Sequence, residues 1–201
     1  TYFRDELLQA LVILEEHHIA RSEFKGSWAG AMGQTQFMPT SFHKFAVDFD
    51  GDGKKNIWTS IPDALASTAN YLKQNGWQSG QPWGFEVVLP RTFDYRLHRL
   101  AFSEWGDKGV KRADGGVLPR SGEANLFFPA GADGPAFLVT DNYDVIKRYN
   151  NSDAYALGVA LLGDRIYGAA PLRAAWPVED PILGLQQRVE LQSALMALGY
   201  D

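Results

Sequence analysis

Residues 26–39, GSWAGAMGQTQFMP, constrain this chain more than any other stretch, because small residues, amides and large apolar side chains alternate there. Glycine lets one backbone approach another backbone or a ligand closely, and Pro39 restricts the residue before it to extended conformations. A buried amide needs hydrogen-bond partners, so Gln34 and Gln36 would be unusual in a plain core segment. The stretch is therefore either a buried loop whose glutamines hold the backbone or a loop that contacts a ligand, and composition alone favours neither.

The composition is that of a soluble globular protein, since 45% of the 201 residues are apolar and 21% are charged. A net charge of −5 argues against a nucleic-acid partner, which requires clustered lysines and arginines. The lack of cysteine excludes disulfides and zinc–thiolate sites, and no run approaches the roughly 18 apolar residues of a membrane helix. Six Trp, eight Tyr and twelve Phe suit a glycan that stacks and hydrogen-bonds, but they also suit an ordinary core.

Helical periodicity dominates residues 1–83. It predicts a helix over 2–18, a short helix over 40–47, and a helix that Ser60 caps and that ends near Gly76. The residues expected to face the core at helical spacing are Phe3, Leu7, Leu11 and Leu14 in the first helix and Ile61, Leu65, Ala69 and Leu72 in the third.

Strand and turn patterns replace this periodicity over residues 84–140, where PWGFEVVLP and GPAFLVT read as strands between glycine-rich turns. Helical character returns over 141–170, and residues 154–166 are apolar almost all round, which predicts a central buried helix. A proline-punctuated linker follows over 171–184, and residues 185–201 are again helical by period. The predicted fold is therefore α+β and mainly helical, with a small antiparallel β insertion.

An acidic turn, DFDGDGKKN, occupies residues 48–56. It has the register of a calcium loop, with carboxylates at alternate positions and glycine at position 6. Thr59 replaces the usual glutamate at position 12, and Asp63 is available one helical turn later. The alternative is a solvated turn, but aligned carboxylates repel one another without a cation. We expect a structural calcium ion of modest affinity, whose ligands would be Asp48, Asp50, Asp52, the Lys54 carbonyl, Asn56 and Asp63.

A second cluster of polar residues, RYNNSDAYALGV, spans residues 148–159. Its Asn, Ser and Asp residues are typical of a helix start, and capping alone would explain them. Tyr149 and Tyr155, however, bracket that cap on either side. A group of tyrosines and amides ahead of a buried helix can also line a sugar cleft, by stacking and by hydrogen-bonding N-acetyl groups.

Together, GSWAGAMGQTQFMP, DGDGKKNIW, ALASTANYL and RYNNSDAYA resemble the membrane-bound lytic murein transglycosylase B family over roughly residues 2–167. The final segment, 185–201, also resembles the start of a peptidoglycan-binding module. The resemblance implies a lysozyme-like helical domain, residues 1–83 and 141–170, with a β insertion and a long glycan groove. It gives peptidoglycan strands as the partner, a periplasmic location and no organic cofactor. An outer-membrane lipid anchor in the full-length protein and cell-wall synthase partners would be consistent with it.

The activity that the resemblance implies is cleavage of the β-1,4 bond between N-acetylmuramic acid and N-acetylglucosamine without water. One Glu protonates the leaving oxygen and, as a carboxylate, then helps the muramyl C6 hydroxyl attack C1, which leaves a 1,6-anhydro end. This scheme departs from the two-carboxylate chemistry of most glycosidases. A lone acid of this kind needs its pKa raised by an apolar, partly desolvated site.

The resemblance also carries residue roles over by motif position. It implies that Ser27 orients the catalytic Glu and that Asn150 holds the reacting N-acetyl region or that Glu. Gln36 would bind sugar hydroxyl or acetamide groups. The further substrate contacts and groove walls would be Phe37, Tyr71, Tyr149 and Tyr155.

The catalytic Glu itself has no match. In the family it lies in a Glu-Ser/Thr-x-x-Gly segment upstream of the GSWAG motif, and no Glu here has that context. Glu23 is close to Ser27 in sequence, but its setting, SEFKG, differs. We therefore expect a fragment, clipped at both ends, that is inactive alone. The alternatives are a non-catalytic peptidoglycan-binding protein with the same groove and a calcium-dependent structural module.

Overall fold

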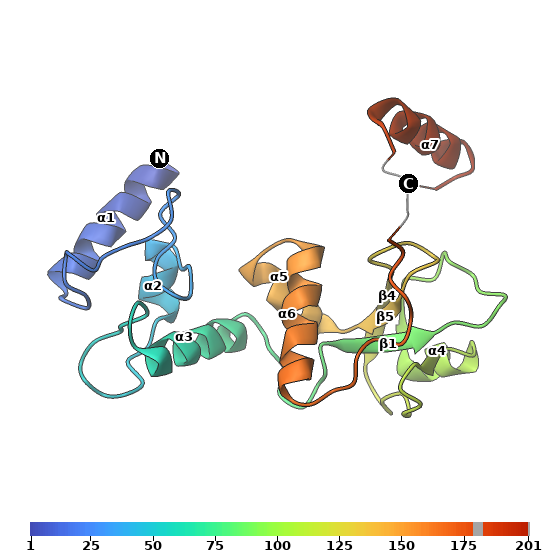
Figure 1. The fold of residues 1–201 in the computed structure, drawn as a ribbon, viewed down its shortest axis with the longest axis horizontal. Helices are drawn as coiled ribbons and strands as arrows, with labels where there is room; N and C mark the ends of the chain where they lie inside the picture. The colour runs from blue at the N-terminus through green and yellow to red at the C-terminus, as the bar shows by residue number, and fades with distance from the viewer. Residues whose placement is uncertain (179–182, 201) are drawn as a thin grey trace.

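The computed structural model describes residues 1–178 and 183–200. Figure 1 shows an elongated arrangement, with helices at one end, a β-sheet at the other and a pair of helices between them. This architecture is the α+β fold that the sequence predicts. The helices are α1 (Tyr2–Glu15), α2 (Pro39–Phe45), α3 (Ile61–Gln74), α4 (Phe102–Asp107), α5 (Asp141–Tyr149), α6 (Asp153–Ile166) and α7 (Leu185–Ala197).

The ends of the first helices have local causes. α1 ends before the predicted His18, because His17 adopts a φ of 58°, outside the helical region. α2 begins at Pro39, where the missing N–H would have no partner within the helix. α3 starts as predicted, since the Ser60 hydroxyl accepts a hydrogen bond from the Asp63 N–H at 3.3 Å.

The predicted core face of α1 is wrong. Phe3, Leu7 and Leu11 are all more than half exposed, whereas Glu6 and Ile13 are buried. Glu6 is drawn inward because its carboxylate accepts bonds from the Thr40 N–H at 2.9 Å and the Thr40 hydroxyl at 2.7 Å. These bonds serve the N-terminus of α2, where backbone N–H groups lack helical partners. A charge-assisted cap, rather than the apolar stripe, decides which face of α1 meets α2.

The predicted face of α3 is wrong for the same reason. Ile61, Leu65 and Ala69 are exposed, and the buried side chains include Asp63 and Ser67. Asp63 accepts the N–H groups of Phe49 and Asn56, each at 2.8 Å, and Ser67 accepts the N–H of Val47 at 3.0 Å. The backbone of the acidic turn thus lies over the polar face of α3, and its buried N–H groups find their partners there.

The sheet is antiparallel throughout, in the order β2-β4-β5-β1-β3. The segments PWGFEVVLP and GPAFLVT supply β1 and β5, as predicted, and these two strands pair with Phe85 opposite Leu138. Gly84 permits this pairing, because a Cβ at that position would lie 2.5 Å from the Leu138 carbonyl oxygen. The strands are β1 (Gly84–Val88), β2 (Arg99–Ala101), β3 (Lys111–Arg112), β4 (Glu123–Phe127) and β5 (Ala136–Val139).

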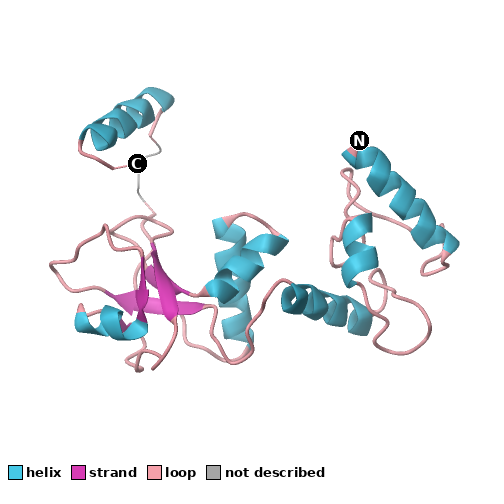
Figure 2. Cartoon of the chain, turned by 180° about the vertical axis from the view of Figure 1, so that it is seen from behind, coloured by secondary structure: helices cyan, strands magenta, loops and turns pink. Residues whose placement is uncertain are grey.

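Both faces of the sheet are covered (Figure 2). Alternate side chains of β5 point to opposite faces, so Phe137 packs with α5 and α6 while Leu138 packs with α4. Trp105 of α4 is fully buried and donates from Nε1 to the Ala124 carbonyl at 3.0 Å. A separate apolar cluster, which includes Met32, Phe37 and Ile57, lies among the N-terminal helices.

α6 is not the central buried helix that its composition predicts. Ala156, Leu157 and Ala160 are buried, but Leu162 is 61% exposed and Ile166 is 77% exposed. α7 stands apart from the sheet in Figure 1, and none of its residues is buried. Part of the predicted linker, 179–182, lies outside the described residues. Among the helices of the described ranges, none is both long and apolar enough to cross a membrane.

Candidate functional site

The stretch 26–37 folds back on itself. Met32 pairs with Gly26 on one side and with Phe37 on the other, and Met32 and Phe37 exchange backbone hydrogen bonds at 2.8 and 3.2 Å. Both side chains are buried, so they anchor the loop in the helical core. Gly33 opens the tip with a φ of 61°, and a Cβ there would lie 2.7 Å from the Ile57 carbonyl oxygen.

The tip of this loop presents two glutamines to a cavity. Gln34 donates from Nε2 to the Trp58 carbonyl at 3.1 Å, and Gln36 donates to the Gly33 carbonyl at 2.9 Å. Both side chains are exposed, and they line a cavity of about 500 Å³ that we call the glutamine cavity; Glu23 and Trp58 also line it. Each glutamine donates a side-chain N–H to a backbone carbonyl, as the buried-loop interpretation expects. Its remaining amide groups face the cavity, as the ligand-contact interpretation expects.

Gln36 adopts a φ of 51°, in the left-handed region that non-glycine residues rarely occupy. Strain of this kind costs about 1–3 kcal/mol and gathers at functional sites. The bond from the Gln36 side chain to Gly33 helps to hold the conformation. Ser27 lies earlier in the loop, where its exposed hydroxyl accepts the Ala31 N–H at 3.1 Å.

Tyr149 joins this loop to the second polar cluster of the sequence. Its hydroxyl donates to the Thr35 carbonyl at 2.5 Å, and its ring lies 5.8 Å from that of Phe37 and 4.8 Å from that of Tyr71. Tyr71 donates in turn to the Arg148 carbonyl at 2.7 Å. Burial raises the pKa of Tyr149 to about 12 and also raises the pKa of Tyr71, so both hydroxyls remain proton donors at neutral pH.

Asn150 is the C-cap residue that follows α5, and its side chain is exposed. A salt bridge from Lys147 to Asp153, at 2.8 Å, spans the turn that holds Asn150. The Ser152 hydroxyl caps α6 by accepting the Tyr155 N–H at 3.3 Å. The turn therefore caps α6 through Ser152 and leaves the Asn150 amide exposed to solvent.

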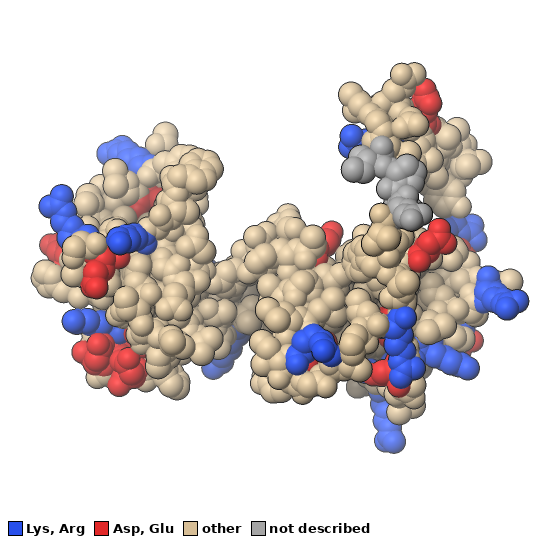
Figure 3. Space-filling model, viewed as in Figure 1, with Lys and Arg blue, Asp and Glu red and all other residues tan. Residues whose placement is uncertain are grey.

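Tyr149 and Tyr155 line a second cavity of about 480 Å³, which we call the tyrosine cavity. Trp77 and Val159 contribute further apolar wall, and Gln34 lines this cavity as well as the glutamine cavity. Figure 3 shows the surface hollowed between the N-terminal helices and the α5–α6 pair, with few charged side chains in the hollow.

The structure brings some of the predicted site residues together and leaves others at the margin. Gln36 lines the glutamine cavity, Tyr149 and Tyr155 line the tyrosine cavity, and the Tyr149–Thr35 bond ties the two loops together. Ser27 and Asn150 lie beside these cavities in the chain, next to the lining residues Gly26 and Tyr149. The sequence interpretation overlooked the cavity residues Gln34, Trp58 and Trp77; only the repeated amides of the first motif could have pointed to Gln34.

The acidic turn brings three carboxylates together. Oxygen atoms of Asp48, Asp50 and Asp63 lie within 4.8 Å of one another, and Figure 3 shows acidic side chains gathered at this end of the molecule. Asp52 turns instead to the Lys54 N–H at 2.8 Å, and the Asn56 side-chain oxygen accepts the N–H groups of two residues that follow it. Carboxylate oxygens at this separation fit a hard cation such as calcium.

The carboxyl groups in or near these cavities are held by hydrogen bonds or lie open to solvent. Asp164 lines the tyrosine cavity, half-buried, and accepts a hydrogen bond from Trp83 Nε1 at 2.9 Å. Glu6 and Asp63 are buried, but their oxygens accept hydrogen bonds from α2 and from the acidic turn. Glu23 lines the glutamine cavity but is exposed. None of these carboxyl groups stands in the Glu-Ser/Thr-x-x-Gly context that the family resemblance implies for the catalytic acid.

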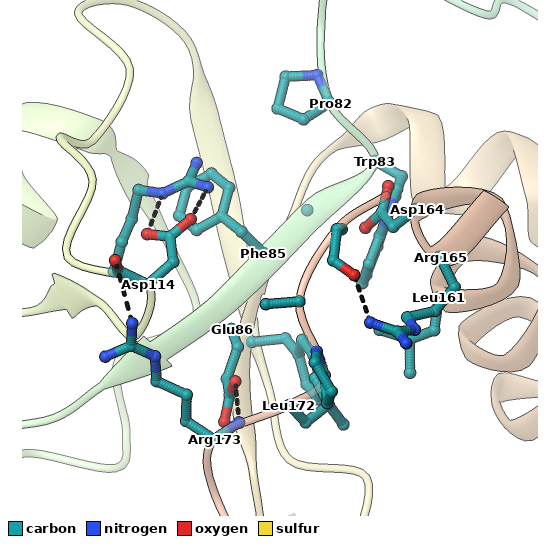
Figure 4. A pocket seen from close by; sticks show the side chains of 16 residues that line it. Pro82, Trp83, Phe85, Glu86, Asp114, Leu161, Asp164, Arg165, Leu172 and Arg173 are labelled. Atoms are coloured by element: carbon teal, nitrogen blue, oxygen red, sulfur yellow. Dashed lines mark hydrogen bonds and ion pairs between the residues drawn. The ribbon is translucent and has the colours of Figure 1, made fainter. Parts of the chain in front are cut away.

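A third cavity, of about 510 Å³, lies between β1, α6 and the segment 168–174 (Figure 4). Charged groups that line it have partners within the protein: Glu86 accepts the backbone N–H groups of Arg173 and Ala174 at 2.8 and 2.7 Å, and Arg112 pairs with Asp114. We call residues 168–174 the strap, because these bonds hold it against the sheet. The cavity therefore belongs to the packing of the strap on the sheet, and we do not treat it as a second candidate site.

Comparison with known proteins identifies the class. The family model described as "Transglycosylase SLT domain" matches residues 1–164. The chain belongs to this family, and its predicted resemblance to the membrane-bound lytic murein transglycosylase B family is confirmed.

Individual relatives agree with this assignment. The chain is 34% identical to membrane-bound lytic murein transglycosylase B of Escherichia coli K12 over 178 residues, which cover 82% of the chain and 46% of that protein. It matches Pseudomonas aeruginosa SltB3 in complex with NAG-anhNAM-pentapeptide at a TM-score of 0.87 and 54% identity, over 98% of this chain and 54% of that one. It matches Escherichia coli Slt35 in complex with calcium at a TM-score of 0.67 and 32% identity, over 83% and 53%. The chain spans about half the length of these relatives.

Proposed function

We propose that this chain supplies much of the glycan-binding groove of a lytic murein transglycosylase, which cleaves the β-1,4 MurNAc–GlcNAc bond of peptidoglycan and leaves a 1,6-anhydro end. The observation that carries the proposal is the Tyr149–Thr35 hydrogen bond. It joins two loops distant in sequence, so that the glutamine cavity and the tyrosine cavity meet. Amides beside aromatic rings are suited to an aminosugar polymer, whose rings stack and whose acetamides hydrogen-bond.

Each predicted site residue then has a role in the groove. Gln36 binds sugar hydroxyl or acetamide groups, Tyr155 forms a wall, and Phe37, Tyr71 and Tyr149 hold the loops in register. Ser27 and Asn150 orient the reacting groups. The acid that protonates the leaving oxygen is a Glu outside these residues, and the 201-residue chain alone binds glycan without cleaving it.

The test is glycan binding followed by product analysis. Calorimetry with peptide-free MurNAc–GlcNAc oligomers should show binding that Gln36→Ala weakens about three- to tenfold, the effect of one lost hydrogen bond, with little loss of stability. Gln74→Ala is a matched control, since Gln74 is exposed on α3 and bonds only within that helix. The protein as its gene encodes it should release muropeptides with anhydro ends, seen by mass spectrometry. Binding with no cleavage would support a non-catalytic peptidoglycan-binding protein.

We also propose that the acidic turn binds calcium as a structural ion. Asp48, Asp50 and Asp63 would hold it, with Asp52, Asn56 and the Lys54 carbonyl turning toward it. Calcium added to chelator-treated protein should raise the melting temperature, and Asp50→Ala should abolish the rise. Asp52→Ala tests the wider ligand set, because it should weaken the rise only if Asp52 joins the ion. An unchanged melting temperature in the unsubstituted protein would contradict the proposal.

The location and the module boundaries follow from the same proposal. A protein that acts on peptidoglycan meets its substrate in the periplasm, where an outer-membrane anchor and cell-wall synthases would be neighbours. Residues 1–83 and 141–170 form the helical core, 84–140 the insertion, 171–184 the linker and 185–201 the start of a peptidoglycan-binding module. Fractionation of cells that produce the encoded protein tests the location.

A further inference from the structure

Gln34 occupies the junction between the two cavities. Its side chain lines both the glutamine cavity and the tyrosine cavity. The walls on its two sides differ in character. Gln36, Glu23 and Lys25 make the first cavity the more polar of the two, whereas Trp77, Tyr155 and Val159 make the second largely apolar.

The position of Gln34 is fixed by its surroundings. Its backbone N–H donates to the Ile57 carbonyl at 2.9 Å, and its Nε2 donates to the Trp58 carbonyl at 3.1 Å. The next residue is held by the bond from Tyr149 to the Thr35 carbonyl. The side-chain bond uses one of the two N–H groups of the amide, so the amide oxygen and the second N–H remain available to a ligand. A pre-positioned amide loses little conformational entropy on binding.

A ligand that occupies both cavities must combine repeated polar groups with flat apolar faces, which describes a chain of aminosugars. We propose that Gln34 is a specificity-determining residue at which the glycan strand passes from one cavity to the other, with its amide bonded to an acetamide or hydroxyl group of the crossing sugar. This inference rests on the proposed function. It adds that the two cavities act as one extended site and that Gln34 couples them.

The experiment compares oligomers of two lengths. Calorimetry would measure the affinity of peptide-free MurNAc–GlcNAc disaccharide and of oligomers of at least four sugars for the 201-residue chain, which on the proposed function does not cleave them, and for its Gln34→Ala variant. A disaccharide fits within one cavity, whereas the longer oligomer must cross. Gln34→Ala should therefore weaken the longer oligomer about three- to tenfold and the disaccharide less than twofold. Gln34→Met, which keeps the bulk of the side chain, should give the same pattern, and Gln74→Ala should change neither affinity.

The outcomes separate this inference from the proposed function. If the unsubstituted protein binds no oligomer of either length, the proposed function fails. If it binds both and Gln34→Ala leaves the preference for the longer oligomer intact, only the role of Gln34 fails. An equal loss at both lengths with a lower melting temperature in Gln34→Ala and Gln34→Met would make Gln34 a structural brace and would also overturn the inference.

Discussion

The sheet and the N-terminal helices bury their apolar side chains to different extents. In the sheet and the helix α4 packed on it, Phe137, Leu138 and Trp105 have no exposed surface. In the helical end, Ile13 and Ile57 are equally buried, but Leu7 is 60% exposed and Leu65 is 68% exposed. The sheet is therefore held mainly by apolar burial, at roughly 25 cal/mol for each Å² removed from water.

The helical end depends more on polar anchors. Glu6 holds the N-terminus of α2, Asp63 holds the acidic turn, and Tyr149 holds the tip of the 26–37 loop. Each anchor satisfies a backbone group of another segment of the chain. The comparison indicates why the candidate site lies at this end: hydrogen bonds can fix an irregular loop in one conformation, whereas the apolar sheet supplies a scaffold.

The largest effect is expected in the sheet. Trp105→Ala removes a fully buried indole together with its hydrogen bond to the Ala124 carbonyl. We expect a loss of about 3–5 kcal/mol in the free energy of unfolding, measured by urea denaturation. Leu65→Ala is the matched apolar change in the helical end, and it should stay within about 0.5 kcal/mol. Similar losses for the two variants would remove the distinction between the two regions.

Glu86→Ala should have the next largest effect, at the strap. Glu86 accepts the N–H groups of Arg173 and Ala174, and hydrogen bonds to charged groups contribute about 1.5–3 kcal/mol each. Their loss should free the strap, so that trypsin cleaves after Arg173 at least about tenfold faster. Asp107→Ala, which changes an exposed carboxylate of α4, should leave this rate unchanged. A rate equal to that of the control would mean that apolar packing alone holds the strap.

Tyr149→Phe tests the anchor that joins the two loops. Burial raises the pKa of Tyr149 from 10.0 to about 12. The folded state therefore keeps the proton where the unfolded state releases it, and this contribution to stability is complete below pH 10 and is lost as the pH rises toward 12. Denaturation across this range should show a steeper decline for the unsubstituted protein than for Tyr149→Phe. Tyr2→Phe, at an exposed tyrosine, should behave like the unsubstituted protein.

The sequence predicted the elements better than their faces. The β1 and β5 strands and the Ser60 cap follow from local patterns, and the structure contains them. The exposed faces of α1 and α3 could not be predicted, because Glu6 and Asp63 are held inward by bonds to backbone groups 34 and 14 residues away. Hydrophobic periodicity reflects only the spacing of apolar residues. It therefore does not detect a carboxylate that is buried because it accepts a hydrogen bond from an N–H group of another segment.

The same limit applies to the candidate site. The motifs identified Gln36, Tyr149 and Tyr155, which line the cavities. They gave no sign that Gln34 lines both cavities, because its position depends on its bonds to Ile57 and Trp58, more than twenty residues away. Gln34 and Gln36 are the same residue type, so only their three-dimensional neighbours determine that Gln34 lies at the junction.

The smallest effect on stability is expected at Gln36, where affinity should fall while stability changes little. Its φ of 51° is unfavourable for any residue but glycine. Gln36→Gly relieves this strain and loses only the exposed bond to Gly33, so the free energy of unfolding should rise or fall by no more than about 1 kcal/mol. Affinity for MurNAc–GlcNAc oligomers should nevertheless fall about three- to tenfold, as in Gln36→Ala. A variant that kept full affinity would mean that the loop backbone, rather than the Gln36 side chain, contacts the sugar.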